Sequence, residues 1–173
     1  MATYKIDAAH SEILFKVKHL MITTVTGQFK TFDATLTAET ENFSDAQVSF
    51  TADINSIDTR NEQRDGHLKS DDFFNAEQFP QLSFASAGVT PSGDGFELTG
   101  NLTIRDVTRP VTLKASYNGL MVDPWGQTKV GFEAEGTIKR KEFGLSWDAV
   151  TEAGGVVVSD DVKLLLNVQF IKQ

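Results

Sequence analysis

Apolar and polar residues alternate along most of this chain, and this two-residue period is the feature that most limits how it can fold. Residues 10–20, "HSEILFKVKHL", show it clearly, since alternate side chains of an extended strand point to opposite faces. One face would be apolar and the other mostly charged. The inward set is Ile13, Phe15 and Val17, followed at the end of the run by His19.

The same alternation recurs in about eight segments. Turn sequences separate them, including "PSGDG" at 91–95, "RDVTRP" at 105–110 and "DPWG" at 123–126. One-sided antiparallel strands at this spacing predict an all-β sandwich or an up-and-down barrel.

The composition predicts one globular domain, spanning residues 1–173. A net charge of −8 disfavours nucleic acid and anionic membrane surfaces as partners. The chain has no cysteine and no apolar run of the roughly 20 residues that a membrane span needs. The start, "MATYKIDAAH", lacks the features of a signal peptide, which predicts a cytoplasmic location, or a periplasmic one if a leader was removed.

One segment, residues 59–79, interrupts the strands with helix-compatible spacing. We expect Thr59 to cap a short helix with Glu62 in a capping box, and Ser70 to cap a second short helix over 71–74. Such an insert could lie across a barrel mouth. Its anchors on the sheet would be Leu68, Phe73, Phe74 and Phe79.

Four blocks of sequence carry a resemblance to a known family. They are "YKIDAAHSEILFKVKHL" with "VTGQF", "GHLKSDDFFNAEQFPQLSFAS", "GNLTIRDVTRPVTL" and "GTIKRKEFGLSW". In this order, from about Tyr4 to Phe170, the chain closely resembles the YceI-like polyisoprenoid-binding proteins. The resemblance implies a lipocalin-like, eight-stranded antiparallel barrel that holds a long isoprenoid lipid in an elongated cavity, commonly as a dimer.

Small residues at inward positions raise the question of whether such a barrel is hollow or filled. A filled barrel favours larger side chains there, although a glycine inside a strand can also mark a bend. The resemblance favours a cavity, with a lipid chain passing over the small residues. These residues are Ala52, Gly100, Ala115, Ala134 and Gly136.

His19 and Arg140 share the inward parity of their strands and would form a polar end to the cavity. There they would read a diphosphate, carboxylate, amide or quinone head group. Alternatively, each lies beyond its strand in solvent or is a structural group. His67 and Asp71, four residues apart on a possible helix, could clamp a metal, but a solvated helix face or a cap interaction explains them better and no third ligand sits at a recognised spacing.

We therefore expect a non-catalytic carrier or storage protein for a polyisoprenoid or fatty-acid-like lipid, with a polyprenyl diphosphate or isoprenoid quinone as possible ligand, acting as a homodimer. We expect no cofactor, no metal and no catalytic residue. The alternatives are an enzyme that uses His19 or His67 on an apolar substrate, and a stress-associated interaction protein with a filled barrel. The expected ligand-binding residues are Phe15, Val17, His19, Phe29, Phe50, Phe73, Phe84, Leu102, Phe132, Ala134, Gly136, Arg140, Phe143 and Trp147.

Overall fold

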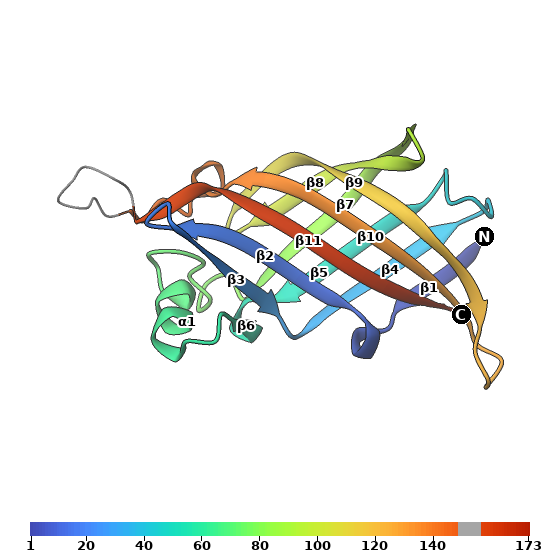
Figure 1. Cartoon of the computed structure of the whole chain (residues 1–173), viewed down its shortest axis with the longest axis horizontal. Helices are drawn as coiled ribbons and strands as arrows, with labels where there is room; N and C mark the ends of the chain where they lie inside the picture. Colours follow the sequence, from blue (N-terminus) through green and yellow to red (C-terminus); the bar gives the residue numbers. More distant parts are fainter. Residues whose placement is uncertain (149–156) are drawn as a thin grey trace.

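The computed structural model describes residues 1–148 and 157–173, whose strands form one β-sheet that closes on itself (Figure 1). The strands are β1 (Ala2–Ile6), β2 (Glu12–His19), β3 (Thr23–Phe29), β4 (Phe32–Ala38), β5 (Gln47–Asp53), β6 (Ile57–Asp58), β7 (Gln81–Ser92), β8 (Gly95–Ile104), β9 (Val107–Val122), β10 (Thr128–Lys139) and β11 (Val158–Lys172). The other elements are helix α1 (Glu62–Lys69) and the 3-10 turns η1 (Ala8–His10), η2 (Ile54–Ser56) and η3 (Arg140–Phe143).

The sheet closes because β1 pairs with β4 on one side and with β11 on the other. Tyr4 lies opposite Leu36 in one ladder and opposite Lys172 in the other. Three of the eleven segments continue bent neighbours, since β1 runs into β2, β3 into β4 and β5 into β6, which leaves eight barrel strands. Every pairing is antiparallel, so the predicted eight-stranded antiparallel barrel is confirmed and the sandwich alternative is wrong.

Two groups of buried apolar residues fill the two ends of the barrel interior. At the α1 end, side chains of the sheet pack with Phe73 and Phe143. At the opposite end, where both chain termini lie in Figure 1, Tyr4, Val130 and Phe170 pack with Phe43 from the β4–β5 loop. The alternating pattern of the sequence thus places its apolar face inside the barrel, as a half-buried sheet requires. Among the described residues, no helix has the length and apolar character needed to cross a bilayer.

The segment between β6 and β7 contains one helix among its described residues, and its caps differ from those expected. Asn61 caps α1, accepting a hydrogen bond from the Arg64 amide at 3.0 Å. Thr59 is instead buried, and its hydroxyl donates to the Asp65 carboxylate at 2.6 Å. Residues 71–74 form turns rather than the expected second helix.

Arg105, in the β8–β9 turn, ties this segment to the end of the barrel. Its guanidinium Nη1 donates to the backbone oxygens of Asp71, Phe73 and Gly144 at 3.1–3.3 Å. The same guanidinium lies 5.8 Å from the ring centre of Phe79. The helical segment is therefore docked on the sheet, as its apolar anchors predicted.

Candidate ligand cavity

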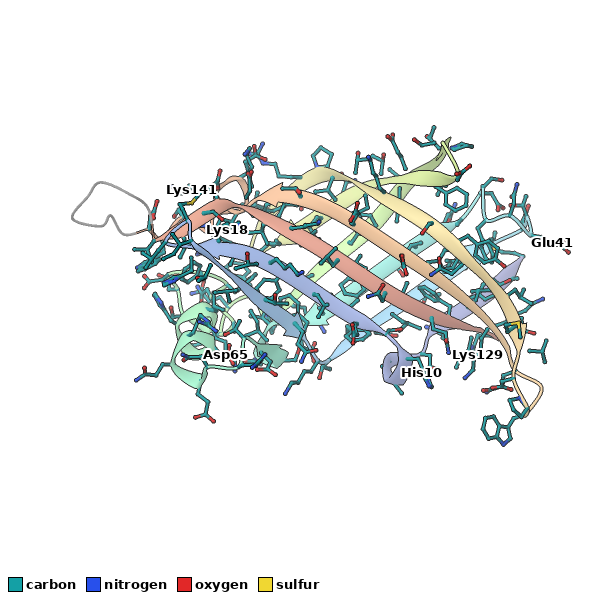
Figure 2. The ribbon with its side chains drawn as sticks, viewed as in Figure 1. His10, Lys18, Glu41, Asp65, Lys129 and Lys141 are labelled. Atoms are coloured by element: carbon teal, nitrogen blue, oxygen red, sulfur yellow. The ribbon has the colours of Figure 1, made fainter. Side chains whose placement is uncertain are left out.

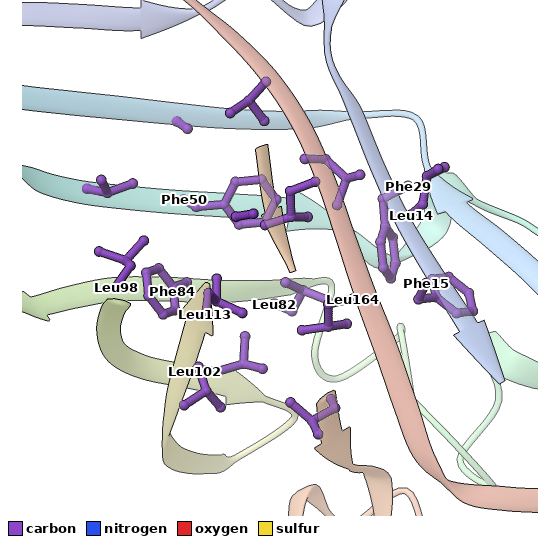
Figure 3. Close-up of a pocket in the computed structure, with 18 of the residues that line it drawn as sticks. Leu14, Phe15, Phe29, Phe50, Leu82, Phe84, Leu98, Leu102, Leu113 and Leu164 are labelled. Carbon is purple, nitrogen blue, oxygen red and sulfur yellow. The ribbon is translucent and has the colours of Figure 1, made fainter. Parts of the chain in front are cut away.

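An elongated apolar cavity of ≈ 250 Å³ lies inside the barrel and reaches both groups of buried residues. Figure 3 shows part of its wall, where aromatic and leucine side chains from several strands surround a common space. Among the described residues, the lining is apolar except for Arg140. At the α1 end, Leu68, Phe73 and Phe74 of the helical segment complete the wall, as expected from the sequence.

The structure brings ten of the fourteen expected ligand-binding residues to this cavity. The ten are Phe15, Val17, Phe29, Phe50, Phe73, Phe84, Leu102, Phe132, Ala134 and Arg140. Their strand parity identified them, since the inner face of a barrel strand carries every second residue. The other four, His19, Gly136, Phe143 and Trp147, are not among its lining residues.

Phe143 and Trp147 support the wall from behind. Phe143 is 1% exposed and belongs to the packed core at the α1 end. The Trp147 ring lies 5.5 Å from the ring of Phe73, which lines the cavity, and 4.8 Å from that of His67. Both residues therefore position lining residues rather than contact the cavity.

Glycine occurs in the barrel wall for a different reason from the one that the sequence suggested. A Cβ added to Gly136 would lie 2.6 Å from Cδ2 of Leu113, so a neighbouring side chain covers this position instead of a lipid chain. The ring of Phe15 covers Gly27 on β3 in the same way. Side chains that lie against glycines leave the middle of the barrel free, while Ala134 lines the cavity directly.

Arg140 forms structural hydrogen bonds, which supports the structural alternative left open by the sequence, while its contact with a ligand head group stays a prediction. Its side chain is 3% exposed and donates to four backbone carbonyls at 2.6–3.2 Å. Burial lowers the pKa of this guanidinium, while Asp148 and Asp160 oppose that shift. The guanidinium joins the residues that follow η3 to the start of β11. The carbonyls belong to Leu145, Trp147, Val158 and Ser159.

The structure places His19 and His67 at the α1 end of the barrel, with His67 in the last turn of α1. His19 is the last residue of β2 and lies opposite Thr23 and Val158 in the two ladders. It is not among the residues that line the cavity, and its contact with a ligand head group stays a prediction. His67 pairs through Nε2 with Asp72 at 2.8 Å rather than with Asp71. Within 1–148 and 157–173, no group of three or more metal-binding side chains comes together.

An aromatic plug closes the end of the barrel opposite α1, and sequence reasoning did not find it. Phe43 is 3% exposed, and its ring lies 5.2 Å from those of Tyr117 and Phe132 and 5.4 Å from that of Tyr4. The available signal was a lone aromatic residue within the polar loop "ETENFSDA". The plug makes the α1 end the better candidate for ligand entry.

Asp45 holds the loop that carries the plug. Its carboxylate accepts hydrogen bonds from the Thr40 hydroxyl at 2.6 Å and from the Glu39 and Thr40 amides at 2.8 and 3.1 Å. These bonds, led by that of the Thr40 hydroxyl, lower the pKa of Asp45 from 3.8 to about 2. The loop is thus fixed by an ionised group at neutral pH.

Comparisons with solved structures agree with this fold. BcnA of Burkholderia cenocepacia superposes with a TM-score of 0.82 at 23% identity, over 95% of this chain and 98% of that one. A polyisoprenoid binding domain from Saccharophagus degradans, implicated in plant cell wall breakdown, gives a TM-score of 0.70 at 15% identity over 98% of each chain. At these identities the two matches establish similarity of fold alone.

Closer relatives extend the comparison to sequence. The YCEI protein of Campylobacter jejuni has a TM-score of 0.77 at 31% identity over 90% of each chain. Protein YceI of Salmonella newport (strain SL254) is 42% identical over 174 residues, covering 99% of this chain and 88% of that protein. The family model of the YceI-like domain matches residues 4–170. The chain therefore belongs to the YceI-like family.

Proposed function

We propose that this protein binds and carries a polyisoprenoid or similar long-chain lipid inside its barrel. The observation that carries the proposal is the cavity, whose described lining is apolar along its length apart from one arginine that is already bonded to carbonyls. Burial of each chain carbon contributes roughly 0.8 kcal/mol, so ten housed carbons suffice for tight binding after the costs of ordering. The Saccharophagus degradans domain, a polyisoprenoid binding domain with this fold, supports the choice of ligand.

The cavity also favours particular ligand shapes and head groups. Its volume of ≈ 250 Å³ lies just below the range of about 300–1,000 Å³ usual for ligand pockets. An extended single chain suits this narrow space better than a bulky lipid. Because the Arg140 donors bind carbonyls, a neutral head group such as a quinone fits better than a diphosphate, whose charge would be buried without a partner.

A binding role without catalysis fits the same lining. The described lining residues offer no hydroxyl, imidazole or carboxylate as acid, base or nucleophile. The alternative of an enzyme would need such a group at the cavity, and His19 is the candidate at its end. Turnover of an apolar substrate that disappears in His19→Ala would favour the enzyme over the carrier.

The proposal is tested by purifying the protein without detergent and extracting it with organic solvent. The extract is then analysed by mass spectrometry. We expect about one isoprenoid lipid per chain from expression in several hosts. Protein that is folded but free of lipid from every host would contradict the proposal. It would favour a filled barrel that acts as an interaction scaffold.

A homodimer is part of the proposal, with a free strand edge as its support. Beyond Ala115, β9 has no described strand partner on the β8 side, so Ser116–Val122 leave backbone groups available for pairing. This stretch contains no charged residue, and Met121 is 74% exposed. An uncharged edge can pair with its own copy. Sedimentation equilibrium checks the mass, and Met121→Lys should give monomers.

The compartment in which the protein works stays a prediction. The expected cytoplasmic location is tested by fractionation of cells that express the native gene. Recovery from the periplasmic fraction would contradict it, and would leave the proposed lipid binding unaffected.

A further inference from the structure

Three consecutive apolar side chains protrude from the turn between β2 and β3. Leu20, Met21 and Ile22 are 39%, 59% and 78% exposed, and we call them the docking tip. Isolated exposed apolar residues are common on proteins, but an adjacent cluster at a protruding turn marks a contact surface.

The geometry of this turn gives no reason for its large apolar residues. Leu20 and Met21 have positive φ values of 53° and 62°, and the Ile22 amide donates to the His19 carbonyl at 3.2 Å. Two successive positive φ values closed by this hydrogen bond are features of a type I′ turn, for which Asn-Gly is favoured. Leucine and methionine are strained in the left-handed region. Residues that strain the turn and face solvent point to a role outside folding.

The docking tip lies at the end of the barrel that carries α1, away from the aromatic plug (Figure 1). Val17, two residues before the end of β2, lines the cavity, and so does Val158, which pairs with His19. The Leu20 amide donates to the Val157 carbonyl at 2.8 Å. A surface bound to the tip would therefore face the end of the lipid cavity.

Two lysines accompany the tip on the outer face of β2. Lys16 and Lys18 have no ion pair with a described residue, and Figure 2 shows Lys18 near the tip. The neighbouring acidic groups already have cationic partners: Asp161 pairs with Lys139 at 2.5 Å, and Asp160 interacts electrostatically with Lys139 and Arg140. The local charge is thus complementary to phosphate groups, although the whole chain has a net charge of −8.

We propose that the docking tip inserts into the headgroup region of a phospholipid bilayer, with Lys16 and Lys18 placed at the lipid phosphates. Three side chains on a convex turn bury far less surface area than the roughly 800 Å² per partner of a stable protein interface. Interfacial insertion needs only a few apolar side chains flanked by lysines. The net charge of −8 repels anionic surfaces, so the partner is a zwitterionic bilayer. The purpose of docking, lipid exchange at the α1 end, rests on the proposed function.

The test measures sedimentation of the protein with phosphatidylcholine vesicles. The key variant is Leu20→Asn with Met21→Gly, which supplies the favoured turn residues and should therefore leave the thermal midpoint unchanged or raised. We expect its partition coefficient to fall at least about tenfold, since burial of two apolar side chains is lost. Lys16→Gln with Lys18→Gln should give a smaller reduction.

The matched control is Trp125→Ser, an exposed apolar residue in the turn between β9 and β10, which lies at the end of the barrel opposite α1 (Figure 1). It should bind vesicles as the parent does. Parental vesicle binding by the Leu20→Asn, Met21→Gly variant would overturn the inference, and so would an equal loss in Trp125→Ser. A change in oligomeric mass of the tip variant would also overturn it, by identifying the tip as a contact between copies.

The same preparations separate this inference from the proposed function. If the solvent extract contains lipid but the parent protein does not bind vesicles, membrane docking is overturned and the proposed lipid-carrier function is unaffected. Vesicle binding that depends on the tip, by a protein without extractable lipid, would support docking and contradict the carrier.

Discussion

At the scale of single residues, the contact between Gly27 and Phe15 tests how the barrel stays hollow. The ring of Phe15 occupies the space that a Cβ at position 27 would need, so Gly27→Ala should push the ring into the cavity. We expect less extractable lipid per chain and a loss of about 1–3 kcal/mol in the free energy of unfolding. The control is Gly88→Ala, because an added Cβ there meets nothing within 4 Å. Unchanged lipid content in Gly27→Ala would refute this account of the wall.

The substitution Arg140→Ala distinguishes two roles for this residue, a structural clamp and a ligand reader that contacts the lipid head group. Arg140→Ala removes the buried guanidinium that donates to four backbone carbonyls and leaves these carbonyls without that donor. We therefore expect the free energy of unfolding, measured by urea titration, to fall by at least about 3 kcal/mol. A ligand reader would instead give a stable protein with altered lipid preference. A stable Arg140→Ala protein would therefore contradict the clamp.

These residues also show what sequence can and cannot predict at this scale. Strand parity found Phe15 and Ala134 because the inner face follows from a local period. It could not find that Leu113 covers Gly136, because this contact depends on the pairing of β9 with β10, which the local pattern does not contain. Likewise, Arg140 has the expected inward parity, but two of its four carbonyl partners, Val158 and Ser159, belong to β11, and the local pattern does not contain this contact.

At the scale of elements, the β4–β5 loop should respond to acid. The folded pKa of Asp45, about 2, lies below the ordinary 3.8, so its contribution to stability is present above about pH 3.8 and is lost as the pH falls through 3.8 towards 2. We expect the Glu39 and Thr40 amides to exchange with deuterium faster over this interval, after correction for intrinsic exchange. In Asp45→Asn, exchange should be fast at neutral pH as well. Protection in that variant equal to the parent's would contradict the role of the carboxylate.

The helical segment at the other end should control access to the cavity. Arg105→Ala removes the donors that hold the backbone at Asp71 and Phe73, so we expect lipid to exchange several-fold faster, measured by transfer of a fluorescent lipid. Phe73→Ala should act in the same direction by removing a wall residue. Arg109→Ala is the control, because this exposed neighbour donates only to Glu142 within the described chain. Exchange as fast in the control as in Arg105→Ala would show that the segment does not gate.

The outline of this segment was predictable, but its caps were not. Leu68 and Phe73 indicated that residues 59–79 dock on the sheet, since apolar side chains need a surface to cover. Thr59 has the right chemistry for a cap, yet tertiary packing buries it against Asp65 and Asn61 takes its place. Capping preferences describe local chemistry and do not decide between two suitable neighbours.

At the scale of the whole molecule, the hollow interior is tested by filling it. Ala134 lines the cavity, so Ala134→Phe should give a folded barrel with little bound lipid. Gly136→Phe should instead destabilise the fold, because Leu113 already occupies the space above it. Two measurements compare these variants. One is the thermal midpoint of each variant after removal of lipid, and the other is the amount of bound lipid per chain in the protein as purified. A large loss of stability in lipid-free Ala134→Phe would mean that the interior is close-packed.

The closure of the sheet by its first and last strands has a consequence for how the chain reaches this state. The pair Tyr4 and Lys172 joins segments that are nearly the whole chain apart, so the barrel cannot close until β11 has been synthesised. Topologies dominated by such distant pairings fold slowly, typically in milliseconds to seconds. Until then, the edges of β10 and β2 that β11 will cover remain available to other chains. Synthesis of this protein therefore includes an interval in which the same surfaces that later enclose the cavity are open to aggregation.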